Sequence, residues 1–160
     1  MEDRLDRIMA VMEAAFDPAY GEAWNRRQLQ DALATPNTHC LLAGSGGRPW
    51  AEGKPATGFL LSRAAPGEEE ILLLAVRPEQ RRRGVASRLV TVFKQAAEAR
   101  GAERLFLEMR VNNPAEAFYR AHDFVSVGRR RNYYRQSDGS YLDAITFAYN
   151  ITGTKVLLAN

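Results

Sequence analysis

The stretch EILLLAVRPEQRRRGVASRLV, residues 70–90, decides the fold of this 160-residue chain. It opens with a near-continuous apolar run, which is typical of a strand buried on both faces in the middle of a sheet. Three consecutive arginines and Gly84 follow, and an apolar pattern with helical spacing continues to about residue 100. The order of strand, basic loop and helix predicts an anion site, because a helix begins with unpaired N–H groups and the positive end of its dipole.

Small residues at the start of this helix favour a phosphate as the anion. Gly84, Ala86 and Ser87 allow a phosphate to approach the backbone closely. Positive charge surrounds them, from Arg81, Arg82, Arg83 and Arg88. The charge run alone is equally compatible with a solvated cap on an ordinary helix. The segment is not a nucleoside triphosphate P-loop, because no Gly-Lys-Ser/Thr follows.

Elsewhere the chain alternates helical and strand patterns. Helices are predicted over residues 3–16, 24–34, 84–100 and 114–121, and strands over 38–44, 57–63, 69–76 and 104–111. Residues 124–151 hold two further strands around a turn at 137–140. We therefore expect one domain spanning residues 1–160, with an α/β or α+β fold built on a mixed sheet.

Composition limits the classes of function that are possible but does not decide between them. The net charge of +3 and a pI near 9.2 are compatible with an anionic ligand. Cys40 is the only cysteine, so no internal disulfide or Cys/His metal spacing is expected. The first 16 residues mix charges into their apolar positions, unlike a signal peptide, and no apolar run reaches membrane length. A cytoplasmic protein without metal or membrane contact is the expectation.

Four stretches together carry a resemblance to a known family. Arg81-x-x-Gly84-x-Ala86 resembles the Q/R-x-x-G-x-G/A signature of the GCN5-related N-acetyltransferases (GNAT), and LEMRVNN, AFYRAHDF and RRNYYRQSDGSYLDAITF look like the RimI family of ribosomal-protein-alanine N-acetyltransferases. The similarity covers residues 58–148, whereas residues 1–57 match loosely. It implies a GNAT fold, with a central mixed, mostly antiparallel sheet flanked by helices. The family's first strand is expected to be missing or vestigial, because the helix pattern starts within a few residues of Met1.

The resemblance also implies acetyl-coenzyme A as co-substrate and assigns residues to it. In the family the loop backbone, here Arg81, Arg82, Arg83, Gly84, Val85, Ala86 and Ser87, binds the pyrophosphate. The strand backbone at Leu74, Ala75 and Val76 would bind the pantetheine arm and polarise the thioester carbonyl. A family asparagine that contacts the coenzyme corresponds to Asn112 or Asn113, and the spacing to Tyr119 favours Asn112.

Two residues carry the chemistry that the resemblance implies. Glu108 shares a strand face with Phe106 and Arg110, and its structural alternative is a pair with Arg110 or a place in solvent. By resemblance it is the general base that accepts a proton from the acceptor amine. Tyr119 is by resemblance the general acid that protonates the leaving thiolate.

On the acceptor side, Tyr133 or Tyr134 is expected to help form a peptide groove. By the same resemblance a loop with Tyr20, Glu22 and Trp24 would face it, and Trp24 is interpreted as a core or groove-wall residue and not as a catalytic one. The arginines and tyrosines of residues 129–135 also suit nucleic-acid binding, but the short stretch and small net charge disfavour it. His122 and Asp123 stand where the family usually has Leu-Gly and are interpreted as structural. His39 and Cys40 point to opposite faces of a strand and form no nucleophile pair.

The sequence therefore predicts direct acetyl transfer to a protein N-terminal α-amine. The expected acceptor is the N-terminal alanine of a small-subunit ribosomal protein, with no acyl-enzyme. An acetyltransferase that acts on a small-molecule amine or a lysine side chain is the first alternative. A non-catalytic coenzyme A or nucleic-acid binding module is the second.

Overall fold

The computed structural model describes residues 2–18 and 21–151. Short 3-10 turns lie at Ser45–Gly47 and Pro78–Gln80. The helices and strands follow in the order α1 (Glu2–Ala15), α2 (Arg26–Leu33), β1 (Thr38–Ala43), β2 (Gly58–Ala65), β3 (Glu68–Val76), α3 (Val85–Ala99), β4 (Arg104–Arg110), α4 (Glu116–Ala121), β5 (Val125–Arg135) and β6 (Tyr141–Asn150).

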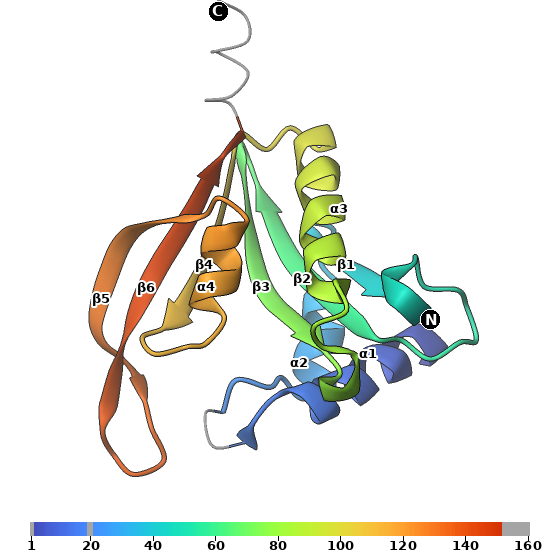
Figure 1. The fold of residues 1–160 in the computed structure, drawn as a ribbon, viewed down its shortest axis with the longest axis horizontal. Coiled ribbons are helices and arrows are strands. Elements are labelled where there is room, and N and C mark those ends of the chain that lie inside the picture. Colours follow the sequence, from blue (N-terminus) through green and yellow to red (C-terminus); the bar gives the residue numbers. More distant parts are fainter. Residues whose placement is uncertain (1, 19–20, 152–160) are drawn as a thin grey trace, which may run out of the picture.

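The strands form one six-stranded sheet in the order β1-β2-β3-β4-β6-β5 (Figure 1). β3 and β4 are its only parallel neighbours among the described residues, because α3 crosses over between them, and every other pair is antiparallel. The expected mixed, mostly antiparallel sheet is confirmed. In the described part of the chain α1 comes before any strand, as the helix pattern at the start of the sequence predicts.

Helices cover both faces of the sheet, and each covered face holds an apolar cluster (Figure 1). α3 contributes Val85, Leu89 and Phe93 to one cluster, which also contains Leu60 of β2. α1 and α2 build the other cluster, which contains Phe59 and Leu61 of β2. β2 is thus the strand buried on both faces, whereas β3 alternates buried and half-buried residues. The expectation of full burial for β3 fails because its second half borders a cavity.

A buried carboxylate joins β2, β3 and the end of α3. Glu69 of β3 is fully buried. It accepts a hydrogen bond from Ser62 Oγ at 2.6 Å and two from the Arg100 guanidinium at 2.9 and 2.6 Å. Because a buried charge needs a partner, this pair fixes the end of α3 against β2 and β3. The sequence pattern gave no sign of it.

Candidate active site

β3 and β4 separate halfway along their length, and this split creates the main cavity. Their parallel pairing runs from Glu68 opposite Arg104 to Ile71 opposite Leu107 and ends there. Leu72 is an extra residue in β3, because Leu61 pairs with Leu73 and Ser62 pairs with Ile71. Such a bulge bends the strand, so β3 turns away from β4 at the point where the pairing ends.

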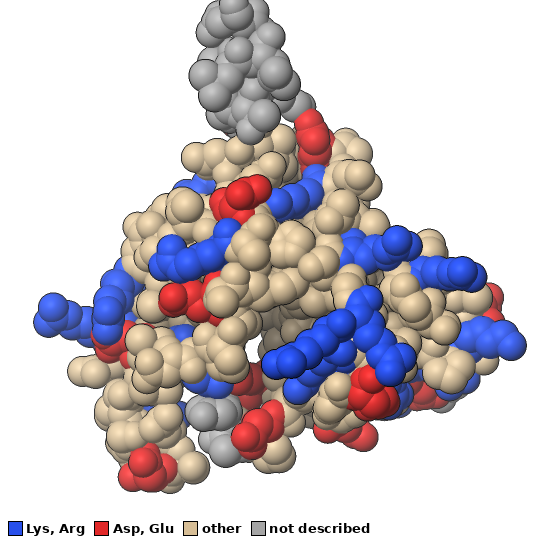
Figure 2. Space-filling view, viewed as in Figure 1, with Lys and Arg blue, Asp and Glu red and all other residues tan. Residues whose placement is uncertain are grey.

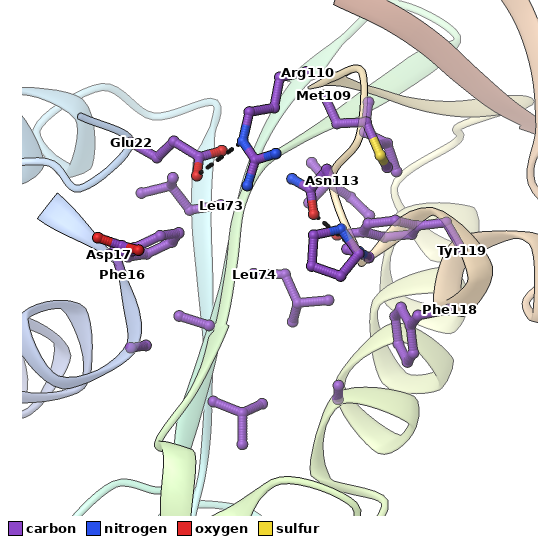
Figure 3. Close-up of a pocket in the computed structure, with 18 of the residues that line it drawn as sticks. Phe16, Asp17, Glu22, Leu73, Leu74, Met109, Arg110, Asn113, Phe118 and Tyr119 are labelled. Carbon is purple, nitrogen blue, oxygen red and sulfur yellow. Dashed lines mark hydrogen bonds and ion pairs between the residues drawn. The ribbon is translucent and has the colours of Figure 1, made fainter. Parts of the chain in front are cut away.

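The cavity has a volume of about 870 Å³. Residues 71–76 of β3 and 107–110 of β4 form two of its walls, and it also reaches the end of α1 and the start of α4 (Figure 3). Backbone N–H and C=O groups on the β3 edge past Ile71 have no β4 partner. An extended ligand with amide groups can hydrogen-bond to such an edge as an added strand does.

Most of the residues that the sequence assigns to coenzyme and catalysis meet at this cavity. Its lining includes Leu74, Ala75, Val76, Arg81, Arg82, Ala86, Glu108, Asn112, Asn113 and Tyr119. A smaller cavity of about 260 Å³ is lined by Gly84, Val85 and Ser87 and shares five lining residues with the first, Val76, Arg81, Arg82, Ala86 and Phe118. The predicted anion site and the split between the strands are therefore adjacent.

Backbone conformation shapes the loop before α3. Arg82 and Gly84 both have positive φ, 62° and 79°. Gly84 is the N-cap of α3 and supplies no side-chain capping bond, so the first-turn N–H groups at Val85, Ala86 and Ser87 border the smaller cavity. Figure 2 shows Lys and Arg side chains around this end of α3, beside a hollow in the surface. Backbone donors and positive charge thus converge where an anion is expected.

The three arginines of the loop have different surroundings. Arg81 donates from Nε to the Val76 carbonyl at 3.3 Å and from Nη2 to the Ala15 carbonyl at 2.9 Å. Its guanidinium therefore joins the end of α1 to the end of β3. Arg82 and Arg83 are exposed, and Arg83 lies outside the lining of both cavities.

Glu108 is half-buried on β4 and faces the cavity. Thr146 of β6 donates to its carboxylate at 3.3 Å, and Arg130 Nε of β5 lies 3.0 Å from the same oxygen. Arg110, the pairing partner that the sequence suggested, instead forms an ion pair with Glu22 at 3.7 Å across the cavity (Figure 3). Neither Arg130 nor Glu22 was linked to these partners by any sequence signal.

Tyr119 is buried on α4, opposite the strand walls. Phe118 and Phe124 pack edge-on against its ring, with centroids at 5.2 and 5.7 Å. Burial raises the pKa of the Tyr119 phenol above its ordinary value of 10. The hydroxyl therefore stays protonated near neutral pH, as a proton donor must.

The two candidate asparagines lie between β4 and α4. Asn112 is exposed and has φ of 67°, which asparagine tolerates better than most residues. Asn113 is half-buried, and its side-chain oxygen accepts a hydrogen bond from the Ala115 N–H at 2.9 Å. This bond begins the turn into α4, so the helix starts at Glu116 instead of Pro114 as predicted.

The residues assigned to the acceptor are partly brought together. Tyr134 is half-buried, and its pKa is raised to about 12, by burial first and then by the charges of Glu108, Tyr133 and Glu22. Tyr133 is exposed and packs edge-on against Tyr134 at 5.1 Å. Trp24 packs against the apolar cluster under α1 and α2 and does not line the cavity. Tyr20 lies outside the described residues.

Other reactive groups lie away from this site. Cys40 on β1 does not line either cavity, and desolvation raises the pKa of its thiol to about 12. Within residues 2–18 and 21–151, no cluster of three or more His, Cys, Asp or Glu side chains is arranged to hold a metal ion. Nor does any helix in the described part of the chain have the length and apolar character needed to cross a membrane.

A sheet that splits between two parallel strands, followed by a glycine-containing basic loop at a helix start, can hold an extended ligand that carries an anionic group. Comparison with protein families agrees. The profile of the Acetyltransferase (GNAT) family matches residues 5–124, and the chain belongs to this family. It is therefore an N-acetyltransferase.

Three individual proteins resemble this chain in sequence or in fold. The chain is 36% identical over 139 residues to the N-alpha-acetyltransferase RimI of Mycobacterium tuberculosis, covering 84% of this chain and 78% of that protein. Its fold matches the ribosomal-protein-S18-alanine N-acetyltransferase of Escherichia coli with a TM-score of 0.75 at 25% identity, over 92% and 87% of the two chains. It also matches the fold of Arabidopsis thaliana NAA60 in complex with acetyl-CoA, with a TM-score of 0.67 at 22% identity, over 81% and 85%.

Proposed function

We propose that this enzyme transfers an acetyl group from acetyl-coenzyme A to the N-terminal α-amine of a protein, with the N-terminal alanine of a small-subunit ribosomal protein as acceptor. The observation that carries the proposal is the cavity between β3 and β4. It brings the loop before α3, the open edge of β3, Glu108 and Tyr119 into one continuous space. A cofactor arm and an amine entering from opposite ends would meet beside Glu108.

The coenzyme fits the loop end of this space. The pyrophosphate would lie at the first turn of α3, held by N–H groups from Gly84 to Ser87 and by the charge of Arg82. The pantetheine amides would pair with the open β3 edge at Leu74, Ala75 and Val76. Asn112 is the proposed contact at the β4 side, because its exposed carboxamide borders the cavity. Bound there, the coenzyme supplies the activated acetyl thioester.

The chain's own residues then move the protons. Glu108 accepts the proton that the α-ammonium must lose before nitrogen attacks the acetyl carbon. A backbone N–H on the β3 edge stabilises the negative charge that develops on the carbonyl oxygen. As the carbon–sulfur bond breaks, Tyr119 donates its proton to the departing thiolate. After the attack the nitrogen still carries two protons, and it releases one of them as the amide forms, which restores the proton of the tyrosinate directly or through water. The proton on Glu108 is released to solvent, so the reaction yields the amide, the coenzyme A thiol and one proton.

An α-amine is an acceptor that a carboxylate base such as Glu108 can deprotonate near neutral pH. Its pKa is about 8, against about 10.4 for a lysine side chain, so a modest base suffices near neutral pH. In the absence of acceptor, Arg130 is paired with Glu108. A peptide α-ammonium is itself a cation, and it would replace Arg130 on the carboxylate as it enters.

Names of relatives support the acceptor. One relative is named an N-alpha-acetyltransferase, and a fold neighbour is named for alanine acetylation of ribosomal protein S18. The stretch from Arg129 to Arg135 carries four arginines, which disfavours a polycationic small amine as acceptor.

Release of coenzyme A thiol tests the proposal. The acceptor is a short Ala-initiated peptide from the ribosomal protein, assayed beside its N-terminally blocked form. Turnover should occur with the free amine only, and Glu108→Gln should lower kcat by about 100-fold or more while acetyl-coenzyme A still binds. Glu70→Gln is the matched control, since Glu70 is a neighbouring carboxylate outside the cavity lining. Acetyl-coenzyme A binding without turnover of this peptide would overturn the acceptor assignment.

A further inference from the structure

We propose that Asp143 is a positioning residue for the acceptor peptide, because it holds a bulge in β5 that places Arg130 beside Glu108. This inference rests on the proposed function and adds a residue to which that function assigns no role. Asp143 lies on β6 outside the lining of both cavities, so any effect it has on catalysis passes through its neighbours.

The bulge is visible in the pairing of the last two strands. Arg130 pairs with Ala144, and the next pair joins Tyr134 to Leu142. Three residues of β5, numbers 131–133, therefore face a single residue of β6, Asp143. Two of these three are surplus to a regular antiparallel ladder. All three are exposed, so their backbone groups, which lie outside the regular ladder, can bond to water or to nearby side chains.

The Asp143 carboxylate binds this part of β5 with both oxygens, one to a backbone N–H of the bulge and the other to the Arg129 side chain. Oδ1 accepts a hydrogen bond from the Asn132 backbone N–H at 2.9 Å, and Oδ2 accepts one from Arg129 Nε at 2.7 Å. Asn132 has φ of 52°, the left-handed conformation that lets the chain fold out of the strand. The same two donors lower the pKa of Asp143 below its ordinary value, so the carboxylate stays ionised at neutral pH.

The bulge decides which side chains reach the base. Arg130, at its near end, forms the ion pair with Glu108 at 3.0 Å, and its guanidinium also lies over the Tyr133 ring at 5.2 Å. Tyr134, at its far end, is half-buried and packs edge-on against the Tyr133 ring at 5.1 Å. Without the bulge, regular pairing would put Asn132 opposite Leu142 and Tyr134 opposite Ser140. Tyr134 would then move two residues along the strand, about 7 Å.

Asp143 therefore acts on the acceptor side alone. Loss of its carboxylate should allow β5 to slip or the 131–133 segment to flatten, which misplaces the peptide-facing side chains. Among the described residues, the Asp143 side chain bonds to Arg129 and Asn132 of β5, and not to β3 or the loop before α3, the walls proposed to receive the coenzyme. A change at this position should thus alter the kinetics for one substrate and not for the other.

A set of four variants tests this with steady-state kinetics. Asp143→Ala should raise KM for the peptide about tenfold or more, with KM for acetyl-coenzyme A unchanged. Asp143→Asn keeps an oxygen that can accept from the Asn132 N–H and should restore most of the affinity. Arg129→Gln removes the ion pair alone and serves as the matched control. Asn132→Gly keeps a residue that adopts positive φ and should stay close to wild type.

Hydrogen exchange at the Asn132 amide reports on the bulge independently of catalysis. The Asn132 amide should exchange its hydrogen slowly in wild type and in Arg129→Gln, and quickly in Asp143→Ala. Fast exchange with an unchanged peptide KM would overturn the positioning role, as would equal rises in both KM values. If the wild-type enzyme acetylates no N-terminal peptide, the proposed function fails instead, and the exchange pattern still reports whether Asp143 holds the bulge.

Discussion

The two ends of the cavity are built in different ways. At the proposed coenzyme end, one continuous stretch from residue 70 to residue 90 supplies an open strand edge and a helix start, so backbone groups would make most of the contacts with the ligand. At the acceptor end, ion pairs join separate segments of the chain. Glu22 of the α1–α2 loop pairs with Arg110 of β4, and Arg130 of β5 pairs with Glu108.

This difference has a functional consequence. Backbone geometry at the coenzyme end is set by local conformation, so it changes little when distant side chains are replaced. The acceptor end depends on side chains that meet only in the folded chain. Changes at the first end should therefore act on acetyl-coenzyme A, and changes at the second on the peptide.

The largest effect is expected where the two ends meet. Tyr119→Phe removes the proposed acid but keeps the buried ring, so kcat should fall by about 100-fold with the melting temperature nearly unchanged. Because burial raises the pKa of Tyr119 above 10, its own ionisation should cause no loss of wild-type activity up to pH 10. A pH profile of kcat for both proteins checks this. An unchanged kcat in the variant would remove Tyr119 from the mechanism.

The next largest effect is expected at the coenzyme end. Gly84→Val places a β-branched residue at φ of 79°, where a side chain meets no neighbour but the backbone itself is strained, by about 1–2 kcal/mol. Relief of that strain would move the first turn of α3, so KM for acetyl-coenzyme A should rise about tenfold with peptide KM unchanged. Isothermal titration with coenzyme A gives an independent value. A selective rise in peptide KM would contradict the proposed division of the cavity into a coenzyme end and an acceptor end.

A smaller effect is expected from the ion pair across the acceptor end. Glu22→Gln leaves Arg110, which is 10% exposed, without its charged partner in the loop. Peptide KM should rise about threefold, because the α1–α2 loop loses its tie to β4 while the cavity walls remain. Steady-state kinetics with both substrates would measure it, and Glu52→Gln, on an exposed loop, is the control. An effect confined to acetyl-coenzyme A would contradict the assignment of this end.

No effect at all is expected at Cys40. Burial raises the pKa of its thiol to about 12, so almost no thiolate forms near neutral pH, and the residue lies outside both cavities. Cys40→Ala should keep full kcat, and the wild-type enzyme should resist an alkylating reagent while folded. Inactivation by alkylation at Cys40 would favour an acyl-enzyme over direct transfer.

The contrast between the two ends also explains what the sequence could predict. Spacing alone predicted that the basic loop lies between a strand and a helix, because Gly84 and the apolar pattern around it are local signals. The alternation in β4 placed Glu108 on the half-buried face. The resemblance added its role, and it pointed to Asn112, Asn113 and Tyr119, which all line the cavity.

The ion pairs between distant segments could not be predicted from the sequence. The pairing of Arg130 with Glu108 needs the register of β5 on β6 and of β6 on β4, which no local pattern specifies. The structural alternative that pairs Glu108 with Arg110 does not hold, since Glu22 reaches Arg110 from a loop that is 88 residues away in the chain. The split of β3 from β4 follows from the Leu72 bulge, and a run of leucines gives no sign of a bulge.

The site of acetylation on a mixed acceptor tests the central claim most directly. A peptide with a free N-terminal alanine and an internal lysine would be incubated with enzyme and acetyl-coenzyme A, and fragmentation mass spectrometry would locate the acetyl group. The account predicts modification of the α-amine alone, lost in Glu108→Gln, because Glu108 needs to deprotonate only the weaker base. Acetylation of the lysine with an unmodified N-terminus would contradict it.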